Sequence, residues 1–449
     1  MFRHTKKMVF GLLAAGAALM AAAPAMAAVD SETAYVFNTF SFLFNGALVM
    51  WMAAGFAMLE SGLVRSKNTA TICLKNIALY SIAGIMYYIV GYSLMYTDVS
   101  GYIGSFSFFY NPSDAELTLL GADEATDEMV AATIDGGYSV ASDWFFQMVF
   151  VATAASIVSG TVAERIKLWP FLIFVVVLTA IIYPIQGSWT WGGGWLSEMG
   201  FSDFAGSTIV HSVGGWAAVT GALIVGARKG KYGPDGRVNP MPGANLPLAT
   251  LGTFILWLGW FGFNGGSQLA MGTVSDVADV SRIFANTNAA AAGGAIAALI
   301  LTQIFYKKVD LTMVLNGALA GLVSITAEPL TPTLGAATLI GGIGGVIVVF
   351  AVPMLDKLKI DDVVGAIPVH LIAGIWGTLA VALTNSDASF GTQLFGIVTV
   401  GVFTFVVSWI VWSILKVTIG IRVSEEEELA GLDNAELGME AYPEFSRQV

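Results

Sequence analysis

Two histidines carry the clearest chemical signal in this sequence. The chain has 3 histidines, and His4 lies in a segment that we expect to be cleaved off, which leaves His211 and His370 in apolar stretches. A buried imidazole is neutral, donates one hydrogen bond, accepts another, and keeps an edge for a guest molecule or a proton. Plain hydrogen bonding between helices is the alternative role. A metal site is disfavoured, because neither Cys nor a nearby carboxylate completes a ligand set.

The segments around the two histidines can be aligned. Segments 203–215 and 362–374 each begin with Asp, have Gly at the fourth position, contain a Val-His pair, and end with Gly. This match predicts an internal repeat. The α-helical rise would place His211 and His370 about 12 Å into a hydrocarbon core about 30 Å thick. Substrate sites of inverted-repeat transporters lie at such depths, between the repeats.

The composition indicates the surroundings in which these residues must work. Hydrophobic residues make up 56% of the chain and charged residues 12%, against about 25% charged residues in soluble domains. So little charge cannot cover a water-facing surface, and the class is therefore a membrane protein. The net charge of −12 excludes nucleic acid as a partner, because phosphates require a basic face.

The N-terminus has the pattern of a secretory signal peptide. Residues 1–27 begin with basic residues, continue through an uncharged run, and close on Ala-Met-Ala, a small-x-small cleavage pattern. An uncleaved first helix is the alternative. Export of this kind places the protein in a bacterial inner membrane. Cys73 is the single cysteine, so no intrachain disulfide can form.

The long apolar runs predict an all-α polytopic protein. The runs are continuous and do not alternate, which favours helices over a β-barrel. Eleven transmembrane helices are expected, over residues 38–62, 72–96, 142–162, 168–187, 205–227, 248–271, 283–305, 311–327, 334–354, 364–384 and 391–415.

Basic residues predict the orientation of these helices. Every Lys and Arg after residue 27, except Arg282, falls in or beside alternate connections or in the tail, and cytoplasmic loops collect such residues. We therefore expect the N-terminus outside, in the periplasm, and the C-terminus in the cytoplasm. Segment 97–141 has no Lys or Arg and several acids, so it is expected to be an extracytoplasmic loop.

The repeat and the span count together predict the domain organisation. The membrane domain would cover residues 28–415, with two pseudo-repeats over about 38–227 and 248–384, an eleventh helix, and a cytoplasmic tail over 416–449. Each pseudo-repeat has five helices, an odd number, so the second must be inverted relative to the first.

Several motifs resemble one known family. They run from the first predicted span to the tail and read GFAMLESGLVR (55–65), FQMVF (146–150), VAERI (162–166), WGGG (191–194), DFAG (203–206), GWFGFN (259–264) and EEEELAGLD (425–433). On these residues the chain resembles the ammonium transporter (Amt/Rh) family, and in particular the bacterial Amt proteins.

The resemblance implies a site at the outer end of a pore. It assigns Phe146, Trp191 and Ser267 to an outer cation site, and Phe150 with Phe263 to a stacked pair that closes the pore below. Ammonium that loses its hydration needs substitutes: ring faces contribute about 2 kcal/mol each when desolvated, and a hydroxyl accepts one N–H bond. Potassium has no N–H to donate. The plainer alternatives are an interfacial role for the Trp and ordinary helix packing for the Phe pair.

The resemblance also implies the pore centre and its support. His211, His370 and Trp260 would line the pore, and Asp203 would hold the site together without touching the substrate. Where some relatives have a second Asp, this chain has Gly365.

Other departures and charged groups concern the cytoplasmic side. Where some relatives have a tail His, this chain has Leu437, and its acidic outer loop is longer than in close bacterial relatives. We expect Glu60 to pair locally, Glu164 and Arg165 to form an interfacial ion pair, and Glu425–Glu428 to be either a solvated cluster or part of a regulatory tail.

The expected function is ammonium transport. Ammonium would bind outside, lose a proton near the Phe pair, and pass as ammonia along the histidines, with methylammonium as an analogue. No cofactor and no metal are expected. The resemblance implies a homotrimer and, as a possible partner, a PII-type regulator at the cytoplasmic face.

The sequence supports three other functions less well. An ammonium sensor would be expected to carry an output domain, and the predicted tail is short. An enzyme is disfavoured, because no hydrolase or metalloprotease motif is present. Carbon dioxide, suggested for Rh relatives, is an alternative substrate.

Overall fold

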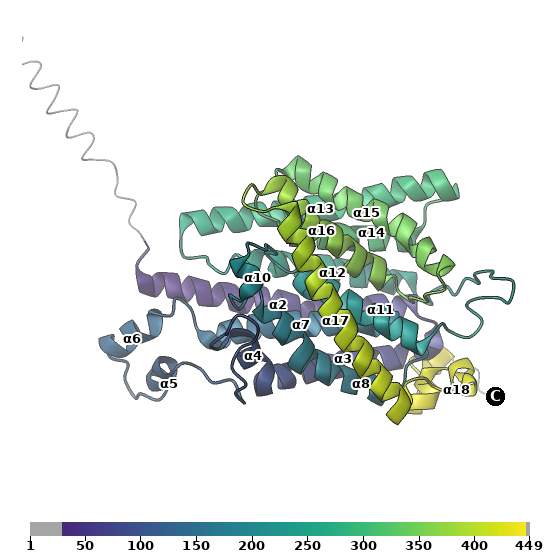
Figure 1. The fold of residues 1–449 in the computed structure, drawn as a ribbon, viewed down its shortest axis with the longest axis horizontal. Helices are drawn as coiled ribbons and strands as arrows, with labels where there is room; N and C mark the ends of the chain where they lie inside the picture. Colours follow the sequence, from purple (N-terminus) through teal and green to yellow (C-terminus); the bar gives the residue numbers. More distant parts are fainter. Residues whose placement is uncertain (1–28, 446–449) are drawn as a thin grey trace, which may run out of the picture.

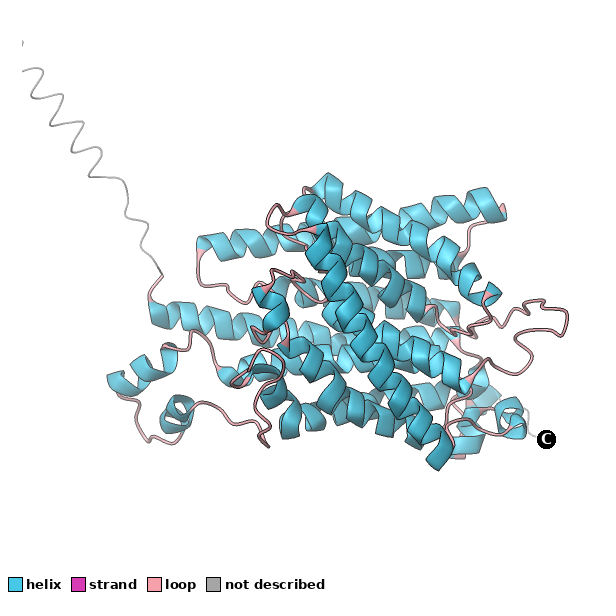
Figure 2. Ribbon diagram, in the orientation of Figure 1, coloured by secondary structure: helices cyan, strands magenta, loops and turns pink. Residues whose placement is uncertain are grey.

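The computed structural model describes residues 29–445, and this part of the chain is helical (Figure 2). It has no strand; its two isolated β-bridges join Ile166 to Arg422 and Tyr232 to Val238. The predicted all-α class is confirmed. The signal peptide expected over residues 1–27 lies outside the described residues.

Within residues 29–445, 10 helical segments are long and apolar enough to cross a membrane. The remaining predicted span corresponds to α14 (Leu311–Thr326), which has 16 residues and a length of about 24 Å at the α-helical rise. The count of eleven therefore stays a prediction. Six of the segments are α2 (Ser31–Leu63), α7 (Val140–Thr161), α12 (Leu246–Gly266), α13 (Val274–Tyr306), α15 (Leu334–Lys357) and α17 (Phe390–Thr418).

The other four segments are each made of consecutive helical pieces. They are η1 (Ser66–Asn68) with α3 (Thr69–Met86), η2 (Tyr87–Gly91) and α4 (Tyr92–Tyr96); α8 (Leu168–Val177) with η3 (Leu178–Ile182) and α9 (Tyr183–Ser188); η4 (Ser207–Ser212) with α11 (Val213–Val225); and η5 (Ile367–Ile372) with α16 (Ala373–Thr384).

Capping side chains explain where several helices begin. Asp30 accepts a hydrogen bond from Thr33 N at the start of α2, and Asp310 accepts bonds from Thr312 N and Met313 N at the start of α14. These bonds satisfy backbone N–H groups that the helix itself leaves free. An apolar run therefore begins as a helix where a short polar residue precedes it.

The helices pack into one bundle around η4 and η5. Helix α2 lies along α12, helices α13, α14 and α15 pack on one another, and α17 crosses the bundle obliquely (Figure 1). Segments η4–α11 and η5–α16 cross each other closely at two glycines. A Cβ on Gly215 would lie 2.6 Å from Leu371 Cβ, and one on Gly374 would lie 2.5 Å from the Ser207 carbonyl oxygen. Only glycine allows this approach.

Short helices mark the two ends of the bundle. The acidic segment 97–141 forms α5 (Asp114–Leu120) and α6 (Asp127–Ile134), which lie at the same end as α10 (Trp195–Glu198) (Figure 1). The tail helix α18 (Glu425–Ala430) lies at the opposite end (Figure 1), and η6 (Asp433–Leu437) and η7 (Pro443–Phe445) follow it in the chain. The acidic loop and the tail are thus separated by the full length of the helices, and these ends are called the outer end and the tail end below.

Candidate functional site

A cavity of about 370 Å³ opens among aromatic side chains near the outer end. All three residues expected at an outer cation site, Phe146, Trp191 and Ser267, line it, together with Phe150. The structure therefore brings together residues from α7, from the turn after α9, and from the end of α12. Ring faces attract a desolvated cation.

Asp203 stabilises this part of the site from behind. Its two carboxylate oxygens accept hydrogen bonds from four backbone N–H groups, those of Gly206, Ser207, Thr208 and Ile209. Its backbone carbonyl accepts a hydrogen bond from Trp191 Nε1 at 2.9 Å. Burial raises the pKa of the Asp203 carboxyl to about 6, although the backbone donors lower it. The residue is not among those that line the outer cavity.

Ser267 provides a hydrogen-bond acceptor to the cavity. Its hydroxyl donates to the carbonyl of Phe263 at 2.8 Å, one turn earlier in α12. Because the hydroxyl proton is used in this bond, the oxygen lone pairs remain for an external N–H donor.

Two phenylalanines separate the outer cavity from the histidines. The rings of Phe150 and Phe263 have centroids 4.2 Å apart and an interplanar angle of 36°, and both side chains are buried. Phe146 meets Phe150 edge-on at 4.8 Å. The expected pair is thus in contact; Phe150 lines the cavity, and Phe263 packs against His211.

His211 and His370 meet beneath this pair. Their Nδ1 atoms are 3.1 Å apart, so one ring donates to the other. His211 is stacked against Trp260 at 4.9 Å and against Phe263 at 5.1 Å. Among the described residues no group is bonded to His211 Nε2, which is buried. His211 therefore keeps one ring nitrogen that no described residue bonds.

Both histidines lie in π-helical turns, η4 and η5. The depth expected from sequence assumed an α-helix from the Asp onward, and this assumption was wrong. Residues 203–206 and 362–365 form loops, with Gly206 at φ 104° and Gly365 at φ 80°. The loops allow each Asp to fold back onto the N–H groups of the following turn. Gly365, noted as a departure, has the conformation of its counterpart Gly206.

Sequence reasoning missed Asp143 in the outer cavity. Its side chain lines the cavity, and its Oδ2 accepts a hydrogen bond from Tyr92 O–H at 2.7 Å. Asp143 precedes Phe146 by three residues in α7, so the two lie on one face of the helix. That spacing was the available signal.

The tail end of the bundle contains a buried cluster of charges. Glu164 pairs with Arg65 and Arg228, and Arg228 also binds Asp361 through its backbone N–H and two guanidinium nitrogens. The expected Glu164–Arg165 ion pair was wrong: Arg165 donates to four backbone carbonyls instead. Burial by itself would raise the pKa of Asp361, but hydrogen bonds from Arg228 and the charges of Arg165 and Arg228 lower that pKa well below its usual range.

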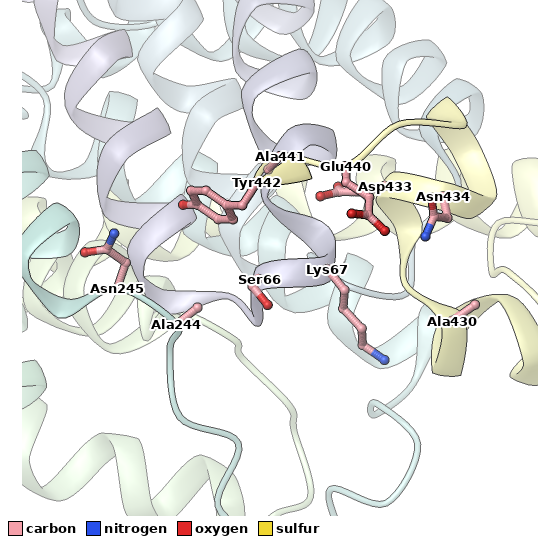
Figure 3. A pocket seen from close by; sticks show the side chains of 10 residues that line it. All are labelled: Ser66, Lys67, Ala244, Asn245, Ala430, Asp433, Asn434, Glu440, Ala441 and Tyr442. Carbon is pink, nitrogen blue, oxygen red and sulfur yellow. The ribbon is translucent and has the colours of Figure 1, made fainter. Parts of the chain in front are cut away.

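The tail docks onto this charged face. Glu428 is buried and accepts bonds from Arg422 and from Lys229 N, while Asp433 accepts from the N–H groups of Ala70 and Thr71. The Glu425–Glu428 run is therefore partly anchored and not wholly solvated. A pocket of about 440 Å³ lies between the tail and the segment after α2, and Figure 3 shows the residues that line it.

Comparisons with known proteins place the chain in one family. The sequence model of the Ammonium Transporter Family matches residues 40–442. The chain is 41% identical to ammonium transporter Amt2 of Archaeoglobus fulgidus over 435 residues, which covers 90% of this chain and 87% of that protein. It is 38% identical to a putative ammonium transporter of Synechocystis over 417 residues, covering 91% and 90% of the two chains.

Solved structures share the fold. A structure titled Sensor Amt Protein is 37% identical to this chain and has a TM-score of 0.80. The match covers 90% of this chain and 98% of that one. Mep2 of Candida albicans is 26% identical with a TM-score of 0.76, covering 94% of this chain and 95% of that one. The family match spans nearly the whole described chain, and this chain belongs to the ammonium transporter family.

Proposed function

We propose that this protein is a channel-type ammonium transporter that recruits ammonium at its outer end and conducts ammonia past paired histidines. The single observation that carries the proposal is the order in which the groups contact one another. Phe150 lines the aromatic cavity and packs on Phe263, Phe263 packs on His211, and His211 meets His370.

Recruitment follows from the chemistry of the outer cavity. Ammonium would be stabilised by the faces of Phe146 and Trp191 and would donate one N–H bond to Ser267. The carboxylate of Asp143, which lines the same cavity, adds a negative charge that attracts a cation. Potassium would share the attraction to the rings but has no hydrogen to donate.

Passage below the Phe pair requires the loss of charge. The space around His211 is enclosed by Trp260 and Phe263, and an unpaired ion in such surroundings is strongly disfavoured. Ammonia has both a lone pair and N–H groups, so it can accept from one imidazole and donate to another. The buried histidine nitrogens would therefore guide a neutral molecule.

The membrane arrangement completes the proposal. We place eleven helices in a bacterial inner membrane as two inverted five-helix repeats and a final helix, with the acidic outer loop in the periplasm and the tail in the cytoplasm. We further propose a homotrimer, and a cytoplasmic face that a PII-type regulator could occupy. The basic residues around the docked tail, Arg65, Lys67 and Lys229, support this orientation.

Transport in reconstituted vesicles tests the function. Purified protein should take up labelled methylammonium, with competition by ammonium and none by potassium. Replacement of His211 by Ala or Asp should either lower uptake at least about tenfold or admit potassium. A tenfold lower rate corresponds to a barrier higher by about 1.4 kcal/mol. Phe305→Ala, an exposed aromatic on α13, is the matched control and should transport normally.

Currents recorded on the same vesicles distinguish proton-coupled transport from conduction of neutral ammonia. Charge movement with ammonium indicates that a proton crosses with ammonia, whereas uptake without charge movement indicates conduction of the neutral molecule. Unchanged ammonium selectivity in both His211 variants would refute the role given to the histidine pair.

A further inference from the structure

Glu60 is a buried carboxylate near the tail end of α2 that has one oxygen without a partner. The residue is 1% exposed. Its Oε2 accepts hydrogen bonds from Ser159 Oγ at 2.7 Å and from Asn76 Nδ2 at 3.3 Å. No donor in the described part of the chain is bonded to Oε1. A buried carboxylate oxygen without a hydrogen-bond donor is costly. Oε1 can therefore accept a hydrogen bond from a mobile donor.

Glu60 and His370 line the same small cavity. It measures about 10 Å³ and is lined by Glu60, His370 and Asn316, among others. This volume is close to the minimum for a single water molecule, and ammonia is of similar size. Asn316 and Val364 also line a second cavity of about 180 Å³, which lies toward the tail. Small molecules leaving His370 would therefore meet Glu60 before they reach the tail end.

Lys75 places a positive charge beside Glu60 without filling its free oxygen. Lys75 Nζ donates to the carbonyl of Ser159 at 2.9 Å and lies 4.7 Å from the centroid of the Phe171 ring. The ion pairs formed by the described residues do not include Glu60 with Lys75. Ser159 links the two, since its hydroxyl donates to Glu60. A nearby cation stabilises the carboxylate form, and His370 is the titratable group on the other side of the cavity.

We propose that Glu60 is the proton-exchange group at the inner end of the pore, an inference that rests on the ammonia-conducting function above. Ammonia that leaves His370 takes the proton of the Glu60 carboxyl: the O–H bond breaks and a fourth N–H bond forms. Ammonium departs through the larger cavity. The carboxylate then takes a proton from hydronium in the water on the tail side, so that each ammonia consumes one proton there.

The competing explanation is a structural one. Glu60 could serve only to connect α2 with α3 and α7 through its bonds to Asn76 and Ser159. The two explanations differ in a single property, because a Gln at this position keeps an acceptor oxygen for these donors but cannot release a proton. Glu60→Gln therefore separates proton exchange from packing, and Glu60→Asp restores the proton on a shorter side chain.

Stopped-flow measurement of internal pH in vesicles tests the proposal. Glu60→Gln should slow ammonium-driven pH change at least about tenfold, Glu60→Asp should retain an intermediate rate, and Glu116→Gln should match the parent protein. Glu116 is the control because it is a buried carboxylate of the outer loop, bonded to Tyr35 and Val140 N.

The outcomes are distinct. A Glu60→Gln rate equal to the parent rate overturns the role of Glu60 and leaves the transport function intact. A parent protein that moves no ammonium overturns both.

Infrared difference spectra decide the question if Glu60→Gln does not fold. Addition of ammonium to the parent protein should remove a carboxylic acid band. Glu60→Asp should shift that band, and Glu116→Gln should retain it unchanged. An ammonium-induced spectrum without a carboxyl band, or with a band that Glu60→Asp does not shift, contradicts the proposal.

Discussion

The loops that begin at Asp203 and Asp362 share a sequence pattern but are stabilised by different interactions. Asp203 is buried and accepts four backbone N–H bonds, and no ion pair is found beside it within the described residues. Asp362 accepts two backbone N–H bonds and one hydroxyl bond, from Gly365, Ile367 and Thr161. Its neighbour Asp361 is paired with Arg228.

This difference concerns what each loop depends on. The carboxylate of the outer loop is bonded to its own helix turn, and the N–H groups of Phe204 and Ala205 donate to the carbonyls of Ala327 and Thr326. Hydrogen bonds therefore hold the outer loop. The inner loop depends on Arg228, which also binds Glu164, and Glu164 in turn binds Arg65. Charges from three distant segments therefore stabilise the inner loop beside the docked tail. We expect the inner end to respond to tail movement, and the outer end to do so much less.

The largest effect is expected when Asp203 is removed. Asp203→Ala leaves four buried N–H donors without their carboxylate, and hydrogen bonds to charged groups contribute about 1.5–3 kcal/mol each. We expect a loss of about 4 kcal/mol or more in unfolding free energy, measured by thermal unfolding in detergent. Asp310→Ala removes the cap of α14 and should cost about 1 kcal/mol. Equal losses in the two variants would contradict the special role of the outer loop.

The second effect concerns the charge cluster of the inner loop. Asp361→Asn breaks a buried ion pair, which typically costs about 3–5 kcal/mol. Because the pKa of Asp361 is held below its ordinary value of 3.8, its contribution is present above that pH and is lost as the pH falls further. Melting curves at neutral and acid pH should show this acid sensitivity in the parent protein and less of it in Asp361→Asn. Asp356→Asn, which removes a more exposed pair with Lys231, should change stability by less than about 1 kcal/mol.

The third and smallest effect tests the point where the two halves cross. A methyl group on Gly215 would lie 2.9 Å from the Leu371 backbone, next to His370, and overpacking of this kind costs about 1–3 kcal/mol. Gly215→Ala should therefore reduce transport more than its modest loss of stability explains, because it separates the histidines. Gly335→Ala, where a new Cβ meets nothing within 4 Å, is the control. Normal uptake by Gly215→Ala would show that the crossing tolerates expansion.

Much of the fold followed from local patterns. Continuous apolar runs predicted the helices to within a few residues at several ends, as for the predicted 168–187 against α8 to α9, Leu168–Ser188. The first helix begins earlier than predicted, at Ser31, because the cap Asp30 lies upstream of the purely apolar run. The π-helical turns at both histidines were not predicted, since they depend on side chains that bond back from the preceding loops.

The candidate site, like the fold, was predictable only where it depends on local sequence. Residue types and the repeat singled out His211 and His370, and the resemblance added the aromatic residues, because these features are local to short motifs. Which charges pair, where Asp143 points, and that Glu60 shares a cavity with His370 depend on contacts between segments far apart in the chain. The sequence by itself determined a helical membrane protein with two marked histidines. Only the tertiary structure decided their neighbours, because a hydrogen bond or an ion pair depends on distances that packing sets.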